Sequence, residues 1–232
     1  MKSLLLIVMI CCGSIPAMAQ DCKGFYYLLN NAEIEMTVYD ASGAATGKTI
    51  YKVNNVHKEG DGLISDFSNT YYDKNNKQVN ASTGHFKCSG NTAAIDMKMS
   101  VPASPNGTGD TKIEGKSNAA FLDYPSHMTV GQELPGGSFE MTNKVRGMDM
   151  VLKYTISNRK VTGRETITTA AGSWNCYVIN YDLDFQMTMM SKVVPMKFSA
   201  MEWFAAGFGP VKTASFKDGK KMGGTLITGL KK

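Results

Sequence analysis

Apolar and polar residues alternate along four stretches of the chain, which is the pattern of β-strands with one buried face. The alternation covers residues 33–38, 93–101, 148–157 and 177–189. In each stretch, every second side chain would project from the same face of the strand. No window of the sequence shows a convincing helical repeat of apolar residues. The pattern therefore predicts an all-β protein.

The longest of these stretches predicts a strongly curved sheet. It places seven apolar side chains on one face: Tyr177, Ile179, Tyr181, Leu183, Phe185, Met187 and Met189. At about 3.3 Å per residue this strand would extend roughly 40 Å, whereas typical strands have about five or six residues. Long amphipathic strands suit a barrel or half-barrel with an apolar concave face. We therefore expect a strongly twisted antiparallel sheet curled into a half-barrel.

Turn-forming residues separate the strands. We expect hairpin tips at residues 40–43, 73–77, 157–160 and 217–220. Two longer irregular stretches are expected at residues 102–115 and 123–137. No linker or low-complexity segment divides the sequence, so residues 20–232 are expected to form a single domain.

Residues 1–19 have the pattern of an export signal. Lys2 precedes the apolar run of residues 4–12, which is too short to span a bilayer. Ala17 and Ala19 are the small residues that a signal peptidase recognises, so we predict cleavage after Ala19. A lipid anchor is the less favoured alternative, because no cysteine directly follows suitable small residues. The pattern predicts an exported protein that is periplasmic or associated with the cell surface.

The charged residues argue against a nucleic-acid partner. The formal net charge is +5 at pH 7, but the Lys and Arg residues are scattered and form no basic run. No segment after the signal approaches the length of a transmembrane helix. We therefore expect the mature chain to lack both a transmembrane segment and a nucleic-acid surface.

Three cysteines would remain after cleavage: Cys22, Cys88 and Cys176. Export permits a disulfide bond among them. Because three is an odd number, at least one thiol stays unpaired, and the spacing does not determine which two cysteines would pair. Three buried thiols are an equally open alternative.

No catalytic constellation stands out, so we expect neither an enzyme nor a cofactor. His57, His85 and His127 are far apart in the sequence and lack the spacing of metal ligands. Residues 42–49 look like a phosphate-binding loop, but Ser42 stands where the motif requires Gly or Ala. The residues that follow are typical of a strand, whereas phosphate binding needs the N-terminus of a helix. Nucleotide binding is therefore not expected.

Methionine is unusually frequent, with 16 residues in the chain. Three pairs spaced two residues apart would each share one strand face: Met97 with Met99, Met148 with Met150, and Met187 with Met189. Thioethers can bind Cu(I), so a copper site is a minor alternative. The neighbours on these faces are Ile, Leu and Tyr, which favours an adaptable apolar core or pocket instead.

The concave face would be either a filled core or an open pocket; the sequence does not decide between them, and a filled core is the safer interpretation. The residues that we expect to line a pocket are Met148, Met150, Tyr181, Phe185, Met187 and Trp203. The preferred hypothesis is that the protein binds or carries a lipid or another hydrophobic small molecule. The alternative is a non-catalytic structural or interaction module of the envelope, with a solid core and a protein or glycan partner.

Several short stretches occur in the order and spacing of a known family: residues 22–27, 39–40 with 43 and 46–48, 87–88 with 96–97, 124–126 with 130–131 and 134–135, 171–173 with 176–179, and 203–205 with 207–209 and 211–212. Together they resemble the TapB-like group of exported Bacteroidetes proteins. Phe204 departs from the aromatic hydroxyl residue often seen there. The resemblance implies a half-barrel similar to the lipoprotein-carrier fold of LolA and LolB. It implies no established reaction and no defined site residues.

Overall fold

The computed structural model describes residues 22–97, 121–145 and 148–232. The described residues form thirteen strands and two short 3₁₀ turns, η1 Cys22–Gly24 and η2 Tyr26–Leu28. The strands are β1 Glu33–Asp40, β2 Ala45–Glu59, β3 Gly62–Asp73, β4 Gln78–Ser89, β5 Thr92–Asp96, β6 Phe121–Pro125, β7 Glu133–Leu134, β8 Gly137–Val145, β9 Met148–Thr169, β10 Gly172–Met189, β11 Lys192–Ala205, β12 Gly209–Lys217 and β13 Lys220–Lys231. In this part of the chain, no helix has the length and apolar character needed to cross a membrane. The prediction of an all-β fold is confirmed.

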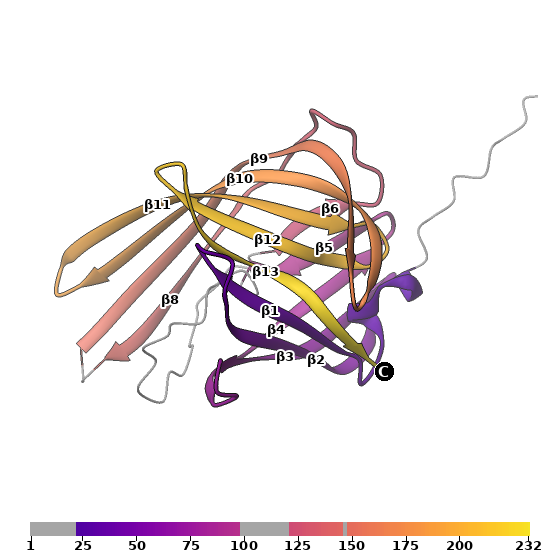
Figure 1. Cartoon of the computed structure of the whole chain (residues 1–232), viewed down its shortest axis with the longest axis horizontal. Helices are drawn as coiled ribbons and strands as arrows, with labels where there is room; N and C mark the ends of the chain where they lie inside the picture. The colour runs from indigo at the N-terminus through magenta and orange to yellow at the C-terminus, as the bar shows by residue number, and fades with distance from the viewer. Residues whose placement is uncertain (1–21, 98–120, 146–147) are drawn as a thin grey trace, which may run out of the picture.

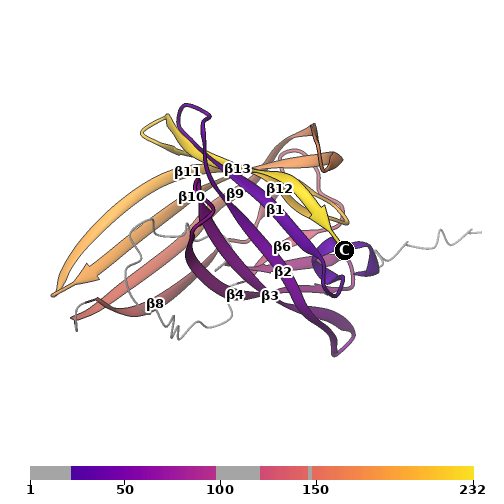
Figure 2. The same ribbon diagram turned by 60° about the horizontal axis from the view of Figure 1, so that its bottom comes forward.

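All thirteen strands belong to one antiparallel sheet (Figure 1, Figure 2). Its order is β6-β5-β4-β3-β2-β1-β13-β12-β11-β10-β9, and β7 and β8 both pair with β9. The first and last strands of the sequence, β1 and β13, pair with each other and so join the two halves of the sheet. The sheet curls into a nearly closed barrel, further than the half-barrel that the sequence predicted.

Side chains close the seam of this barrel, where β6 approaches the start of β8. A Cβ added at Gly137 would lie 2.7 Å from Met97 Sδ, so glycine allows the two edges to approach. Arg159 of β9 spans the seam. Its Nη1 donates to the backbone oxygen of Asp123 at 3.1 Å and to that of Pro135 at 2.7 Å. These hydrogen bonds tie β6 to the segment that follows β7.

A bulge in β9 turns Arg159 into the barrel. The sequence predicted a hairpin tip at residues 157–160, and this prediction is wrong because these residues lie inside β9. Asn158 has a φ of 53°, and the pairing of β9 with β10 shifts opposite Tyr181. An extra residue in one strand reverses the face on which the following side chains lie. Asn158 is consequently exposed, whereas Arg159 is 2% exposed.

The N-terminal turns pack inside one end of the barrel (Figure 1). Phe25 and Tyr27 are fully buried there, and the ring of Tyr27 stacks on Phe86 at 5.4 Å between centroids. Ser65 Oγ of β3 donates to the backbone oxygen of Tyr27 at 2.6 Å. The segment therefore acts as a plug, which we define as residues 22–28.

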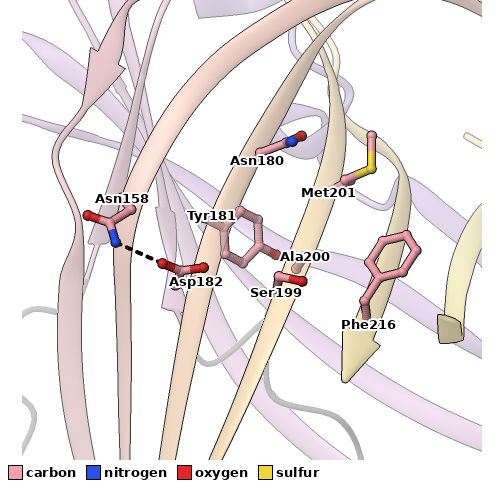
Figure 3. A pocket seen from close by; sticks show the side chains of 8 residues that line it. All are labelled: Asn158, Asn180, Tyr181, Asp182, Ser199, Ala200, Met201 and Phe216. Atoms are coloured by element: carbon pink, nitrogen blue, oxygen red, sulfur yellow. Dashed lines mark hydrogen bonds between the residues drawn. The ribbon is translucent and has the colours of Figure 1, made fainter. Parts of the chain in front are cut away.

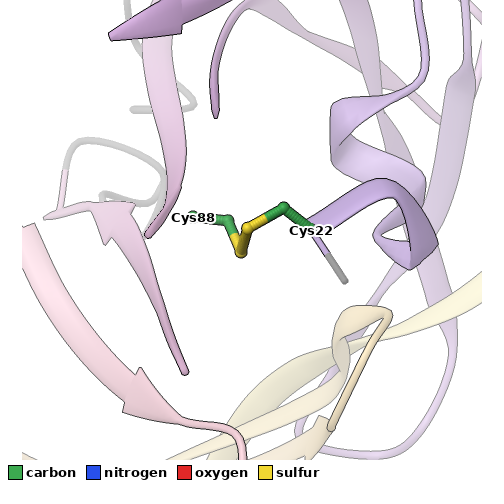
Figure 4. The surroundings of a disulfide bond; sticks show 2 residues. All are labelled: Cys22 and Cys88. Carbon is green, nitrogen blue, oxygen red and sulfur yellow. A yellow bond between two sulfur atoms is a disulfide. The ribbon is translucent and has the colours of Figure 1, made fainter. Parts of the chain in front are cut away.

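A disulfide between Cys22 and Cys88 fastens the plug to β4 (Figure 4). The sequence left the pairing open, and the geometry resolves it, with 5.7 Å between the two Cα atoms. Cys176 is the remaining cysteine of the described chain and is a buried free thiol. Burial and, to a smaller extent, the nearby Glu165 carboxylate raise the pKa of this thiol to about 12. Cys176 is therefore a core residue that stays protonated at neutral pH.

Strands β8 to β11 continue beyond the barrel body as a long arm (Figure 1, Figure 2). The predicted strand at residues 177–189 is confirmed and forms all but the first five residues of β10, which has 18 residues. At the end of the arm, the β10–β11 hairpin exposes Met190, Val193 and Val194. The arm carries the apolar face of the barrel out beyond the closed body.

Candidate functional site

A pocket of about 500 Å³ lies inside the barrel. Its lining comes from both halves of the sheet and from the plug. Six of the lining residues are tyrosines: Tyr27, Tyr39, Tyr51, Tyr71, Tyr124 and Tyr181. Pockets that bind small molecules have volumes of about 300–1,000 Å³. The interior is therefore not fully packed, and its open volume has the size of a ligand site.

The exposure of the lining residues locates the mouth and the floor of the pocket. Met222, in the β12–β13 hairpin region, is 48% exposed, and Tyr39 and Tyr71 are partly buried. At the other extreme, Tyr27 is fully buried and Tyr124 is 3% exposed. The pocket therefore opens near Met222 and ends against the plug and β6.

Glu202 of β11 places a carboxyl group at the floor of the pocket, where it is 5% exposed. Tyr124 Oη donates a hydrogen bond to Glu202 Oε2 at 3.1 Å. The guanidinium of Arg159 lies 4.6 Å from the centroid of the Tyr124 ring. Glu202 is the one charged side chain among the described residues that line the pocket.

The protonation of these groups follows from their burial. Burial raises the pKa of Glu202, because a charged carboxylate is poorly solvated inside the barrel. The positive charge of Arg159 and the hydrogen bond from Tyr124 oppose this effect and favour the ionised form. Burial also raises the pKa of Tyr124 and Tyr181, and it raises that of Tyr51 to about 12. The tyrosine hydroxyls therefore remain hydrogen-bond donors at neutral pH.

Three buried polar atoms that belong to lining residues have no hydrogen-bond partner in the described chain: Tyr27 Oη, Asn69 Oδ1 and Glu202 Oε1. Buried polar groups of folded proteins are nearly always hydrogen-bonded. Leaving one unpaired costs about 1–3 kcal/mol. Three such atoms around one open volume indicate a place for the polar group of a ligand or for ordered water.

A second, smaller depression of about 250 Å³ involves the outward-facing side chains of Asn158 and Asp182 (Figure 3). Asn158 Nδ2 donates to Asp182 Oδ2 at 2.7 Å across it. The two side chains are already hydrogen-bonded to each other, and both are exposed to solvent. We therefore regard the interior pocket as the candidate functional site.

Of the residues that the sequence proposed as pocket liners, the structure places some in or next to the pocket and others elsewhere. Tyr181 lines the pocket, and Phe185 and Met187 follow it along the same face of β10. Phe185 packs against Tyr154 at 4.7 Å between ring centroids, on the concave side of the arm. These two residues therefore extend the apolar surface from the pocket onto the arm.

Two other proposed liners, Trp203 and Met150, lie elsewhere. Trp203 follows Glu202 in β11 and projects from the opposite face, where its Nε1 donates to Glu165 and Lys212 Nζ lies 4.0 Å from its ring centroid. Met150 pairs with Met189 in the arm. The side chain of Met148 lies outside the described residues, as do Met99 and the loop expected at residues 102–115.

Metal binding has few candidate ligands in the described chain. There, no group of three His, Cys, Asp or Glu side chains is arranged around a common point. His85 Nδ1 lies 2.9 Å from Asp66 Oδ1, although the two residues are distant in the sequence, and both are largely exposed. The Cu(I) site suggested by the methionines stays a prediction.

Sequence reasoning missed the two charged residues that organise the interior. Glu202 interrupts the apolar run of residues 200–205, and this interruption was the available signal. Arg159 gave the opposite signal, because residues 157–160 resemble a turn. The side chain of Arg159 points inward because of the bulge in β9, and this bulge is identified only from the pairing of β9 with β10.

Comparison with known proteins places the chain in a family. The model of the DUF3108-like family matches residues 31–227. No curated protein sequence matches the chain. The names of the TapB-like group and of the lipoprotein carriers are not confirmed by these comparisons.

Two solved structures share the fold. One is a proposed exported protein with a YmcC-like fold from Bacteroides fragilis, with a TM-score of 0.73 and 19% identity, covering 90% of this chain and 99% of the other. The second is a proposed lipoprotein from Parabacteroides distasonis, with a TM-score of 0.74 and 19% identity, covering 91% and 100%. Since the family model spans most of the sequence, the chain belongs to the DUF3108-like family.

Proposed function

We propose that this chain is an exported protein that binds a hydrophobic or amphiphilic small molecule inside its barrel. The observation that carries the proposal is the open volume of about 500 Å³ whose lining combines apolar and aromatic side chains with three unpaired polar atoms. Ligand sites typically have this composition, with a few polar groups that orient the ligand in an apolar cavity. No reaction is proposed, and no cofactor is needed for binding.

Three features support export to the periplasm or the cell surface. Residues 1–19 have the pattern of a signal peptide that is cleaved after Ala19. The disulfide between Cys22 and Cys88 suits an oxidising compartment. The two proteins of similar fold are described as a proposed exported protein and a proposed lipoprotein. An envelope location would place the barrel where lipids and other amphiphiles occur.

Native mass spectrometry tests the proposal. The protein, purified from a host that exports it, should carry a bound small molecule that the Ala200→Phe variant lacks. Ala200 lines the pocket and is 6% exposed, so a phenyl group there would occupy the open volume. Ala81→Phe on β4 is the matched control, because Ala81 is exposed and lies outside the lining. A wild-type protein without any bound molecule, or equal occupancy in Ala200→Phe, would refute the proposal.

Contact with another protein of the envelope is the second candidate function. It is favoured by the apolar end of the β10–β11 hairpin, where Met190 is 72% exposed and Val193 is 56% exposed. Exposed apolar residues clustered on a projecting element are typical of interaction surfaces. The arm would then deliver or receive the ligand at a partner, which makes the two functions compatible.

A further inference from the structure

The polar chemistry of the pocket floor is that of an acid surrounded by aromatic hydroxyls. Glu202 supplies the one carboxyl group, and no Lys or Arg is among the described lining residues. Tyr27 and Tyr124 flank this floor, and both are almost completely buried. A ligand that reaches the floor therefore meets a carboxyl group and tyrosine rings, while the nearby cation, Arg159, packs on the ring of Tyr124 and is not among the lining residues.

Only one of the two carboxyl oxygens of Glu202 has a hydrogen-bond partner in the described chain. Its Oε2 accepts the hydrogen bond from Tyr124, whereas Oε1 is buried and has no partner in the described chain. Arg159 does not donate to this oxygen: its Nη1 is bound to two backbone oxygens, and its Nη2 is buried without a hydrogen-bond partner in the described chain. Because Glu202 lines the pocket, its Oε1 is an unpaired acceptor at the edge of the open volume.

Tyrosine rings favour a donor that is positively charged. The faces of aromatic rings attract ammonium groups within about 6 Å, most strongly where water is excluded. A hydrogen bond from a charged donor to a carboxylate is roughly twice as strong as one between neutral groups. An anionic headgroup would instead be placed beside Glu202, and like charges in a buried site repel strongly.

We propose that the pocket binds an alkylammonium compound, whose ammonium group donates to Glu202 Oε1 and whose alkyl chain extends toward the mouth. The chain would contact Met36 and Leu183, which line the pocket between floor and mouth, and would leave near Met222. This inference rests on the proposed function, since it names the ligand class of the same pocket. It excludes fatty acids as the preferred ligands.

The proposal also predicts how binding depends on pH. The titratable and charged groups that face Glu202 are Tyr27 of the plug, Tyr124 of β6, Arg159 of β9 and Tyr181 of β10. Burial raises the pKa of all three tyrosines, so they stay neutral, and Glu202 is the group whose ionisation changes as the pH falls. Burial raises its pKa, and a bound ammonium stabilises its ionised form. The affinity should therefore weaken as the pH falls through this raised pKa.

Calorimetric titration with octylamine, octanol and octanoate tests the ligand class, because the three probes share one alkyl chain. Octylamine is expected to bind at least tenfold more tightly than octanol, and octanoate is expected to bind most weakly. Glu202→Gln should lower octylamine affinity at least tenfold and lower octanol affinity much less, because the amide oxygen of Gln still accepts a hydrogen bond from a neutral hydroxyl. Glu140→Gln, at an exposed position of β8 outside the pocket, should change neither.

The possible results separate this inference from the function on which it rests. Octanol or octanoate binding as tightly as octylamine would overturn the ammonium proposal and leave hydrophobic binding intact. A Glu202→Gln variant that still binds octylamine at least tenfold more tightly than octanol would likewise overturn the ammonium proposal and leave hydrophobic binding intact. Failure of all three probes to bind the wild-type protein would overturn the proposed function itself. The comparison of probes on the wild-type protein does not depend on whether the variant folds.

Discussion

The double substitution Cys22→Ser and Cys88→Ser is expected to lower the free energy of unfolding by about 4 kcal/mol. The disulfide closes a loop of 66 residues, and restricting such a loop in the unfolded chain stabilises the folded state by about this amount. Domains of this kind are stable by about 5–15 kcal/mol, so the loss is a large fraction of the total. Urea unfolding followed by tryptophan fluorescence measures it. A loss below about 1 kcal/mol would contradict the assigned role of the disulfide.

The same substitution should also weaken ligand binding. The disulfide holds the plug in the barrel, and the plug supplies Tyr27 to the pocket floor. Cys176→Ser is a suitable control, because this buried cysteine is not bonded to another and does not line the pocket. The control should retain ligand affinity, whereas the double variant should lose part of it even where both proteins are folded.

Arg159→Met is expected to lower the free energy of unfolding by about 3–5 kcal/mol. The substitution removes the hydrogen bonds to Asp123 and Pro135, and each buried group left without a partner costs about 1–3 kcal/mol. It also removes the cation–π contact with Tyr124, which is worth up to about 2 kcal/mol in a buried site. Because these contacts close the seam, hydrogen exchange of the β6 amides should accelerate in the variant.

Arg164→Met is the matched control for this experiment. Arg164 lies on the same strand and also packs on a tyrosine, with its guanidinium 4.5 Å from the Tyr177 centroid, but it is exposed. Exposed contacts of this type contribute about 0.5–1 kcal/mol. A loss in Arg159→Met no greater than that in Arg164→Met would show that the seam does not depend on the buried guanidinium.

Local patterns predicted the strands, and long-range pairing determined how they close. Alternation located residues 33–38 and 177–189 as strands, and hairpin tips appear at residues 40–43, 73–77 and 217–220 as expected. These features depend on neighbours in the sequence. Closure depends instead on the pairing of β1 with β13 and on contacts of Arg159 across the seam, between residues that no local pattern connects.

The pocket was predicted less completely than the fold. Tyr181 was identified from its place on an apolar strand face, but the same reasoning placed Trp203 inside and overlooked Glu202. Both residues lie in the apolar run of β11, where neighbouring side chains are buried on both faces of the strand. Alternation cannot assign an inner face where both faces are buried. The missing information was the register of β11 with β10 and β12.

Titration of the processed protein with N-phenyl-1-naphthylamine tests most directly whether the barrel interior is an accessible binding site. Fluorescence of this apolar probe rises when it leaves water. We expect saturable binding of one probe per chain to the wild-type protein and to Ala81→Phe, and little or no binding to Ala200→Phe. Absence of saturable binding to the wild-type protein, or undiminished binding to Ala200→Phe, would contradict an open pocket inside the barrel.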